Sequence, residues 1–185
     1  MKNLYFFFLT AACLLLFPGF LSYAGPVDCP QIAVALPADV HEAVAKAEAM
    51  ARSGRYTAAA HSLSAFASKH PSPAFAFVSY DIGFFYYQAR AWKQAIPHLK
   101  RAVVLAPCFI QGQQLLANAL YNAGDVGAAA RVMEKAASMA KDPDLAFQAA
   151  LFWTEANAPK KALPLLRELE MHKTPKTEWF VALSN

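Results

Sequence analysis

The sequence has little charge, little glycine and few cysteines. Only 16% of its 185 residues are Asp, Glu, Lys or Arg, and it contains 7 Gly and 3 Cys. So few glycines exclude a collagen-like chain, and three cysteines are too few for a small disulfide-rich scaffold. The hydrophobic content of 57% excludes a wholly disordered chain, and the length predicts one domain.

The short motifs that mark common catalytic and cofactor sites are also missing. The sequence has no Cys-x-x-Cys pair, no phosphate-binding loop and no Gly-x-Ser-x-Gly elbow. The run from His41 to Ala45 begins like the helix of a zinc protease, but Ala45 stands where the second histidine would be. We therefore predict a protein that is not an enzyme and that has neither a cofactor nor a metal site.

Positive charge exceeds negative charge only slightly, because 17 Lys and Arg oppose 13 Asp and Glu. The cations are scattered, and they are densest at Lys100-Arg101 and Lys160-Lys161. Nucleic-acid binding typically needs a basic stripe with aromatic or groove-entering elements. The sequence shows no such stripe, so we predict a solvated basic surface and no nucleic-acid partner.

The first 24 residues have the layout of a secretory signal peptide. Lys2 precedes a long apolar run, and Ser22 and Ala24 place small residues three and one positions before Gly25. This layout predicts cleavage after Ala24 and a periplasmic or secreted protein of 161 residues (185 − 24). The alternative is an uncleaved leader that anchors the chain, since about 20 apolar residues can span a bilayer. Such a leader would be the only link to a membrane that the sequence predicts.

After the leader, the sequence repeats itself. In four segments a turn is followed by an alanine, and these alanines are separated by 36, 34 and 33 residues. A period of this length indicates stacked helical repeats, in which each unit buries its apolar face against its neighbours. The recurring alanines are Ala59, Ala95, Ala129 and Ala162.

Each unit is predicted to be two helices joined by a tight turn. Gly54, Gly124 and Asn157 stand where the first helix of a unit ends, and these residue types tolerate the left-handed backbone that closes a helix. Arg90 takes this place in the second unit and departs from the rule. Four residues after each recurring alanine, an apolar residue falls on the same face of the second helix. These residues are Leu63, Leu99, Met133 and Leu166.

The predicted boundaries follow from this period. Residues 25–38 contain three prolines and are expected to form an extended lead-in. Asp39 and Glu42 have the spacing of a capping box, so the first helix should open at Asp39. The helical repeat domain then covers residues 39–185. Its repeats span about 39–71, 74–107, 109–141 and 143–175, and a C-terminal helix follows.

The repeats resemble the tetratricopeptide repeat (TPR) family over about residues 39–175. The second unit matches the family pattern best, through Gly83, Tyr86, Trp92, Ala95, Leu99, Ala102 and Pro107. The other three units match it in phase. The resemblance implies an all-α fold, an α-α superhelix (a TPR-like solenoid) of about four helix-turn-helix repeats plus a C-terminal helix.

In the resembled family, the first helices line the concave face and bind extended peptides or helices. Phe77, Tyr80, Phe84 and Tyr87 are spaced by three, four and three residues, so they form one stripe on a first helix. The same phase adds further candidate binding residues: Asn118, Tyr121, Asn122, Phe147 and Leu151. The alternative is that the aromatic stripe is ordinary core. Its two tyrosines favour a partly solvent-exposed surface, where the ring can pack against apolar groups and the hydroxyl can form hydrogen bonds.

Two cysteines remain after the leader, and export favours an oxidised pair. Cys108 lies in the turn from the second unit to the third, and Cys29 lies about ten residues before the first helix. A tether of ~30 Å makes a Cys29–Cys108 disulfide feasible. The alternative is two unrelated thiols.

Thr177 to Leu183 is predicted to form a last helix that is apolar on nearly all sides and therefore needs burial. It would pack against another chain, begin a longer array, or form a frayed tail.

We predict an exported module that binds a protein or peptide segment in a concave groove, as an adaptor or assembly factor in the cell envelope. The alternative is a structural subunit of a constitutive oligomer, formed through the C-terminal helix, or the N-terminal part of a longer repeat array.

Overall fold

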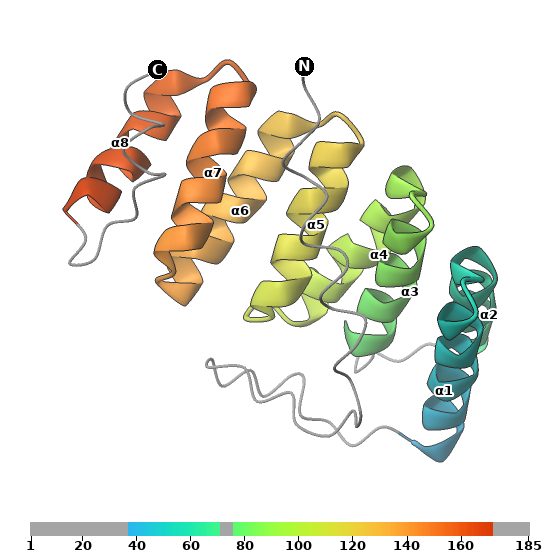
Figure 1. Cartoon of the computed structure of the whole chain (residues 1–185). Helices are drawn as coiled ribbons and strands as arrows, with labels where there is room; N and C mark the ends of the chain where they lie inside the picture. The colour runs from blue at the N-terminus through green and yellow to red at the C-terminus, as the bar shows by residue number, and fades with distance from the viewer. Residues whose placement is uncertain (1–36, 71–75, 172–185) are drawn as a thin grey trace.

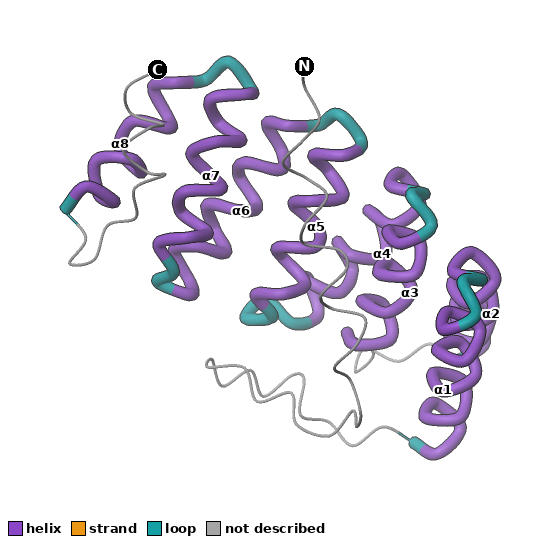
Figure 2. Tube along the Cα trace, in the orientation of Figure 1, coloured by secondary structure: helices purple, strands orange, loops and turns teal. Residues whose placement is uncertain are grey.

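The computed structural model describes residues 37–70 and 76–171, and in these ranges the chain forms an array of eight α-helices (Figure 1). Short turns connect consecutive helices within each described range, and no strand occurs in these ranges (Figure 2). The helices are α1 (Ala38–Arg52), α2 (Tyr56–Lys69), α3 (Ala76–Gln88), α4 (Trp92–Leu105), α5 (Ile110–Asn122), α6 (Val126–Ala140), α7 (Pro143–Glu155) and α8 (Pro159–Glu170). The predicted leader, most of the lead-in and the predicted last helix lie outside the described residues.

Each helix packs mainly against the helix before it and the helix after it in sequence. The first helices α3, α5 and α7 form one layer, and the second helices α4 and α6 lie behind them in Figure 1. The buried apolar residues accordingly form a series of clusters between neighbouring helices. This arrangement confirms the predicted all-α superhelix. None of the described helices is both long enough and apolar enough to cross a bilayer.

The recurring residues of the sequence occupy equivalent buried positions. All four recurring alanines are buried, and so are the four apolar residues that follow them by four positions. Gly83 shows why small residues recur at the helix contacts. A Cβ atom at this position would lie 2.5 Å from Cγ of Leu99 and 3.3 Å from its backbone nitrogen. The close approach of α3 to α4 therefore depends on the absence of a side chain at residue 83.

The turns inside the units have the predicted left-handed backbone. The backbone angle φ is +78° at Gly54, +90° at Gly124 and +56° at Asn157. Arg90 also adopts a positive φ, of +58°, which costs a residue with a side chain roughly 1–2 kcal/mol. Lys141, which follows α6, has a φ of +51° that the repeat pattern did not predict.

The predicted capping box at the start of the first helix is wrong. The helix α1 begins at Ala38, its N-cap residue is Pro37, and no side chain accepts a hydrogen bond there. Asp39 lies inside the first turn instead, where its charge can still interact favourably with the helix dipole. Side-chain caps occur at α6 and α7, where Asp125 accepts from the Ala128 backbone N–H at 3.1 Å and Asp142 caps α7.

Candidate protein-binding surface

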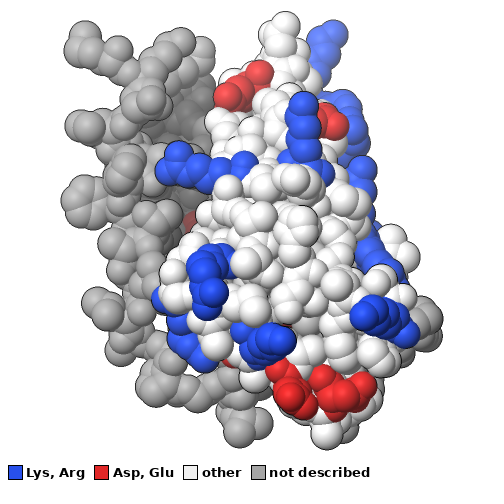
Figure 3. Space-filling view, turned by 90° about the vertical axis from the view of Figure 1, so that its right-hand side faces the viewer, with Lys and Arg blue, Asp and Glu red and all other residues white. Residues whose placement is uncertain are grey.

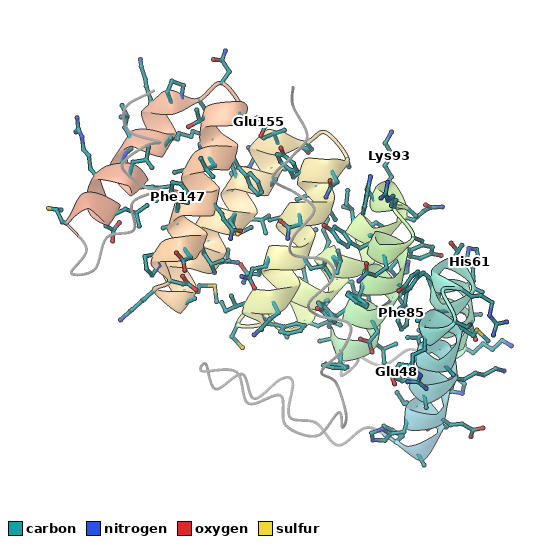
Figure 4. All side chains as sticks on the ribbon, in the orientation of Figure 1. Glu48, His61, Phe85, Lys93, Phe147 and Glu155 are labelled. Atoms are coloured by element: carbon teal, nitrogen blue, oxygen red, sulfur yellow. The ribbon has the colours of Figure 1, made fainter. Side chains whose placement is uncertain are left out.

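The first helices of the last three units carry the side chains that the sequence predicts for partner binding. We call the surface that they form the first-helix face. The predicted residues on it are Phe77, Tyr80, Phe84 and Tyr87 on α3, Asn118, Tyr121 and Asn122 on α5, and Phe147 and Leu151 on α7. Glu155 on α7 belongs to the same face because it accepts a hydrogen bond from Tyr121. Asn122, Leu151 and Glu155 are exposed, and the others are partly buried. Figure 4 marks Phe147 and Glu155 on α7.

Aromatic rings form a continuous series along α3. The rings of Tyr80 and Phe84 are stacked, with centroids 6.3 Å apart, and Phe77 lies at the same centroid distance from Tyr80 on the other side. Buried Phe109, just before α5, extends the series because its ring centroid lies 4.9 Å from that of Tyr80. Phe109 was not among the residues predicted for the site. The only signal was a large aromatic residue next to a turn, where polar residues are more usual.

The aromatic stripe on α3 is half-buried. It is therefore neither a fully exposed binding surface nor an ordinary buried core. Tyr80, Phe84 and Tyr87 pack against the main apolar cluster, yet each keeps some exposed surface. The neighbouring Phe85 and Tyr86 are buried. The stripe is therefore made of rings whose bodies are fixed by the core and whose edges reach the surface.

Hydrogen bonds join the three first helices at their C-terminal ends. Asn122 Nδ2 donates to the Tyr87 hydroxyl at 3.3 Å and to the Asn118 carbonyl oxygen at 2.8 Å. The Tyr121 hydroxyl donates to Glu155, with oxygen distances of 2.8 and 3.1 Å. These bonds connect α3 to α5 and α5 to α7. They hold predicted site residues from different units in fixed relative positions.

Two residues outside the prediction support this part of the face. The ring of Phe152 stacks on Tyr121 with a centroid distance of 4.7 Å, and Trp92 lies 4.9 Å from Tyr87. Trp92 was noted as part of the repeat pattern, but its role as a support for Tyr87 was not predicted. The tyrosine rings are thus held by aromatic neighbours as well as by hydrogen bonds.

The surroundings of both tyrosines keep their hydroxyl groups protonated. The hydrogen bond to Glu155, together with burial and the charge of that carboxylate, raises the pKa of Tyr121. Burial raises the pKa of Tyr87, and the hydrogen bond from Asn122 opposes this shift. Both residues therefore present neutral hydroxyl groups that can donate and accept hydrogen bonds.

The helix α3 also carries a buried carboxyl group, that of Asp81, which the sequence did not predict. One carboxylate oxygen of Asp81 is buried and accepts no hydrogen bond from any described residue. Burial, followed by the charge of Glu48 on α1, raises the pKa of Asp81 well above its ordinary value. Glu48 lies on the side of α1 toward α3 in Figure 4, and it also pairs with Arg52 at 3.7 Å. An ionised Asp81 would thus lack a counter-charge, which favours its neutral form.

The second predicted cysteine takes part in a disulfide. Cys108 is disulfide-bonded, whereas Cys29 lies outside the described residues, so the pairing of these two stays a prediction. Across residues 37–70 and 76–171, His, Cys, Asp and Glu nowhere gather in a group of three or more that could hold a metal ion.

No protein-family model matches the sequence, and a search of curated proteins finds no match. Solved structures of MamA are similar in fold. MamA 41-end from Desulfovibrio magneticus RS-1 superposes with a TM-score of 0.59 at 19% identity, covering 70% of this chain and 73% of that one. For a MamA AMB-1 structure the TM-score is 0.62 at 19% identity, covering 78% and 81%. At this identity the likeness concerns the fold alone: the chain is an all-α superhelix of TPR-like helical repeats.

Proposed function

We propose that the chain is an exported protein-interaction module whose first-helix face binds an extended segment of a partner protein. It would serve as an adaptor or assembly factor in the cell envelope. The observation that carries this proposal is the half-buried aromatic series on α3 beside the hydrogen-bonded side chains of Tyr121 and Asn122 on α5. The TPR-like fold supports it, since helical repeats offer extended binding surfaces.

The chemistry of the face suits a peptide with apolar side chains and a free backbone. The rings of Phe84 and Tyr87 are already ordered, so a partner would lose little affinity to ordering them. The side-chain amide of Asn118 makes no hydrogen bond to another described residue and can pair with a peptide backbone. Covering roughly 300–400 Å² of apolar surface would give about 8–10 kcal/mol before association costs. Those costs leave reversible, micromolar binding.

A displayed peptide library, followed by calorimetry on the selected peptide, tests this proposal. The variants Phe84→Leu and Asn118→Ala keep the helix and should each weaken binding about tenfold, through lost stacking and one lost hydrogen bond. Lys135→Ala on α6 is the matched control, because Lys135 is exposed on a second helix and should leave the affinity unchanged. Wild-type affinity in both first-helix variants would remove this face from the proposed site.

Export is part of the proposal and rests on the layout of residues 1–24. The measurement is N-terminal sequencing of the protein recovered from the envelope fraction. A mature N-terminus at Gly25 supports cleavage after Ala24. A chain that keeps the leader supports membrane anchoring, and a chain found only in the cytoplasm contradicts export.

A second candidate function is a structural subunit of an oligomer or of a longer array, and an observation on α8 favours it. Ala60 and Ala130 are buried, and Ala130 lies in one apolar cluster with Ala150 and Trp153 of the next unit. Leu163 holds the equivalent position on α8 and is 44% exposed. A further repeat unit or a second chain that packed against α8 would bury this exposed apolar side chain. Light scattering decides: a monomer supports the adaptor, and a constitutive oligomer supports the subunit.

A further inference from the structure

In its last three units the superhelix sorts charge between the two layers, whereas in the first unit α1 carries Lys46 and Arg52 and α2 only Lys69. The second helices α4, α6 and α8 carry eight Lys or Arg and three Glu, whereas the first helices α3, α5 and α7 carry three Asp or Glu and no cation. In the sequence these cations look scattered. The repeat brings them together because equivalent positions of successive units fall on the same layer.

The cations lie on the outward side of the second helices. On α4, Lys93, Lys100 and Arg101 are exposed, while Ala95 and Leu99 on the opposite side are buried. Lys161 on α8 is exposed too, but its ammonium group lies over the Trp153 ring, 4.1 Å from the ring centroid. The other exposed cations of this layer, which we call the second-helix face, are Lys93, Lys100, Arg101, Arg131, Lys135, Lys160 and Arg167. Figure 3 shows Lys and Arg side chains following one another along its right-hand margin, the side of the second helices.

The cations of the second-helix face make no ion pair with any residue in 37–70 or 76–171. Within the described ranges the ion pair of Arg52 with Glu48 involves no residue of the second-helix face, and no cation of that face forms an ion pair. Glu134 on α6 accepts a hydrogen bond from Trp153 Nε1 at 2.8 Å, and Glu168 on α8 is exposed. Among the described residues, the second-helix face therefore carries more cations than acids, and no ion pair balances the excess.

Exposed apolar side chains accompany the cations. Val104 is 75% exposed and lies on the same outward stripe of α4 as Lys100, one helical turn further on. Met171, at the end of α8, holds the equivalent position in the fourth unit and is 82% exposed. Cations next to exposed apolar groups match the boundary between lipid headgroups and acyl chains. Nucleic acid would instead favour exposed aromatic rings for stacking, and the outward stripes of α4, α6 and α8 carry none.

From this juxtaposition of unpaired cations and exposed apolar side chains we propose that the second-helix face docks on the surface of an anionic phospholipid bilayer. Cations attract the negatively charged headgroups over about a Debye length, and Val104 and Met171 enter the headgroup region. The protein then lies with α4, α6 and α8 against the membrane. The first-helix face points away from the bilayer, where a partner can reach it. This docking requires neither the predicted leader nor the proposed partner binding.

Partition onto vesicles tests the proposal with the protein in the form that the cell exports. The quantity measured is the ratio of partition coefficients on phosphatidylglycerol-containing vesicles and on pure phosphatidylcholine vesicles, because a retained leader would contribute equally to both. The ratio should exceed one and fall with added salt. The triple variant Lys93→Gln/Lys100→Gln/Arg101→Gln should lower binding to the anionic vesicles roughly a hundredfold, at about fivefold per cation.

The matched control removes the same charge elsewhere. Lys46→Gln/Arg52→Gln/Arg55→Gln changes three exposed cations of the first unit that lie outside the second-helix face. It should keep most of the binding. Val104→Ser, which leaves the charge unchanged, should lower binding severalfold. Equal losses of vesicle binding in the two triple variants would show that binding depends only on the net charge of the protein, and would overturn the proposal. So would equal binding to both vesicle types, or binding of polyglutamate or DNA without any preference for anionic vesicles.

Discussion

Replacing Gly83 with alanine should destabilise the protein, although alanine is the better helix former. A Cβ atom at residue 83 would lie 2.5 Å from Cγ and 2.6 Å from Cδ2 of Leu99, and 3.3 Å from its backbone nitrogen. Leu99 is fully buried, so its side chain has no free space to move into. Overpacking of this kind costs about 1–3 kcal/mol. Because backbone is involved as well as side chain, we expect a value in the upper part of that range.

Helix propensity opposes this cost, and its contribution can be measured separately. Gly→Ala inside a helix gains about 1 kcal/mol. The expected net loss at Gly83 is therefore roughly 1–2 kcal/mol. Gly127 on α6 is the matched control, since a Cβ there would meet only Arg131 Nη1, at an ordinary 3.9 Å. Gly127→Ala should stabilise the protein by roughly 0.5–1 kcal/mol.

Urea denaturation followed by far-UV circular dichroism gives both changes in unfolding free energy. If Gly83→Ala stabilises the protein as much as Gly127→Ala does, the close contact of α3 with α4 is wrong. A second background separates steric clash from other causes. Leu99→Ala alone should cost about 2–5 kcal/mol and leave a cavity, so adding Gly83→Ala to it should be stabilising. Additive effects of the two substitutions would contradict the clash.

Three further predictions concern single groups. The folded state retains the proton of Asp81 above pH 3.8, where the unfolded chain releases it, because burial raises the Asp81 pKa. The contribution of Asp81 to the free energy of unfolding should therefore be fully present below that pH and be lost as the pH rises through the folded-state pKa. Asp81→Asn should abolish this loss in urea titrations at several pH values. Glu155→Gln should lower the pKa of Tyr121 toward its ordinary value in an alkaline absorbance titration, and an unchanged titration would argue against the hydrogen bond. Peptide mapping of unreduced exported protein should recover a Cys29–Cys108 linked peptide, and two free thiols would refute that pairing.

The fold was predictable because the same physical requirement recurs in every unit. A small residue is needed wherever two helices approach closely, so Ala59 and its three equivalents mark the period in the sequence. The left-handed turns follow the same rule, with Arg90 as the visible exception. The start of α1 was misplaced because Pro37 can precede a helix without a side-chain cap, whereas the capping box assumed that Asp39 supplied one.

The site was predictable only to the level of which residues share a face. Tyr87, Tyr121 and Glu155 are separated by 34 residues each, so the period places them in one row. The hydrogen bond between Tyr121 and Glu155 depends on the distance between units, which the period does not give. The isolation of Asp81 is a property of its surroundings in the folded chain, and the sequence around it carries no sign of it.

The two proposed surfaces can be tested independently because the array separates them. Contacts run mainly between consecutive helices, and the cations of α4 point away from the contacts that hold α3 in place. A substitution at Lys100 should therefore leave Phe84 and its ring contacts unchanged, and the reverse should also hold. Each set of variants then serves as the folded control for the other. If the α4 triple variant lost peptide binding together with vesicle binding, the two faces would not be separate, and the assignment of one ligand to each layer would be wrong.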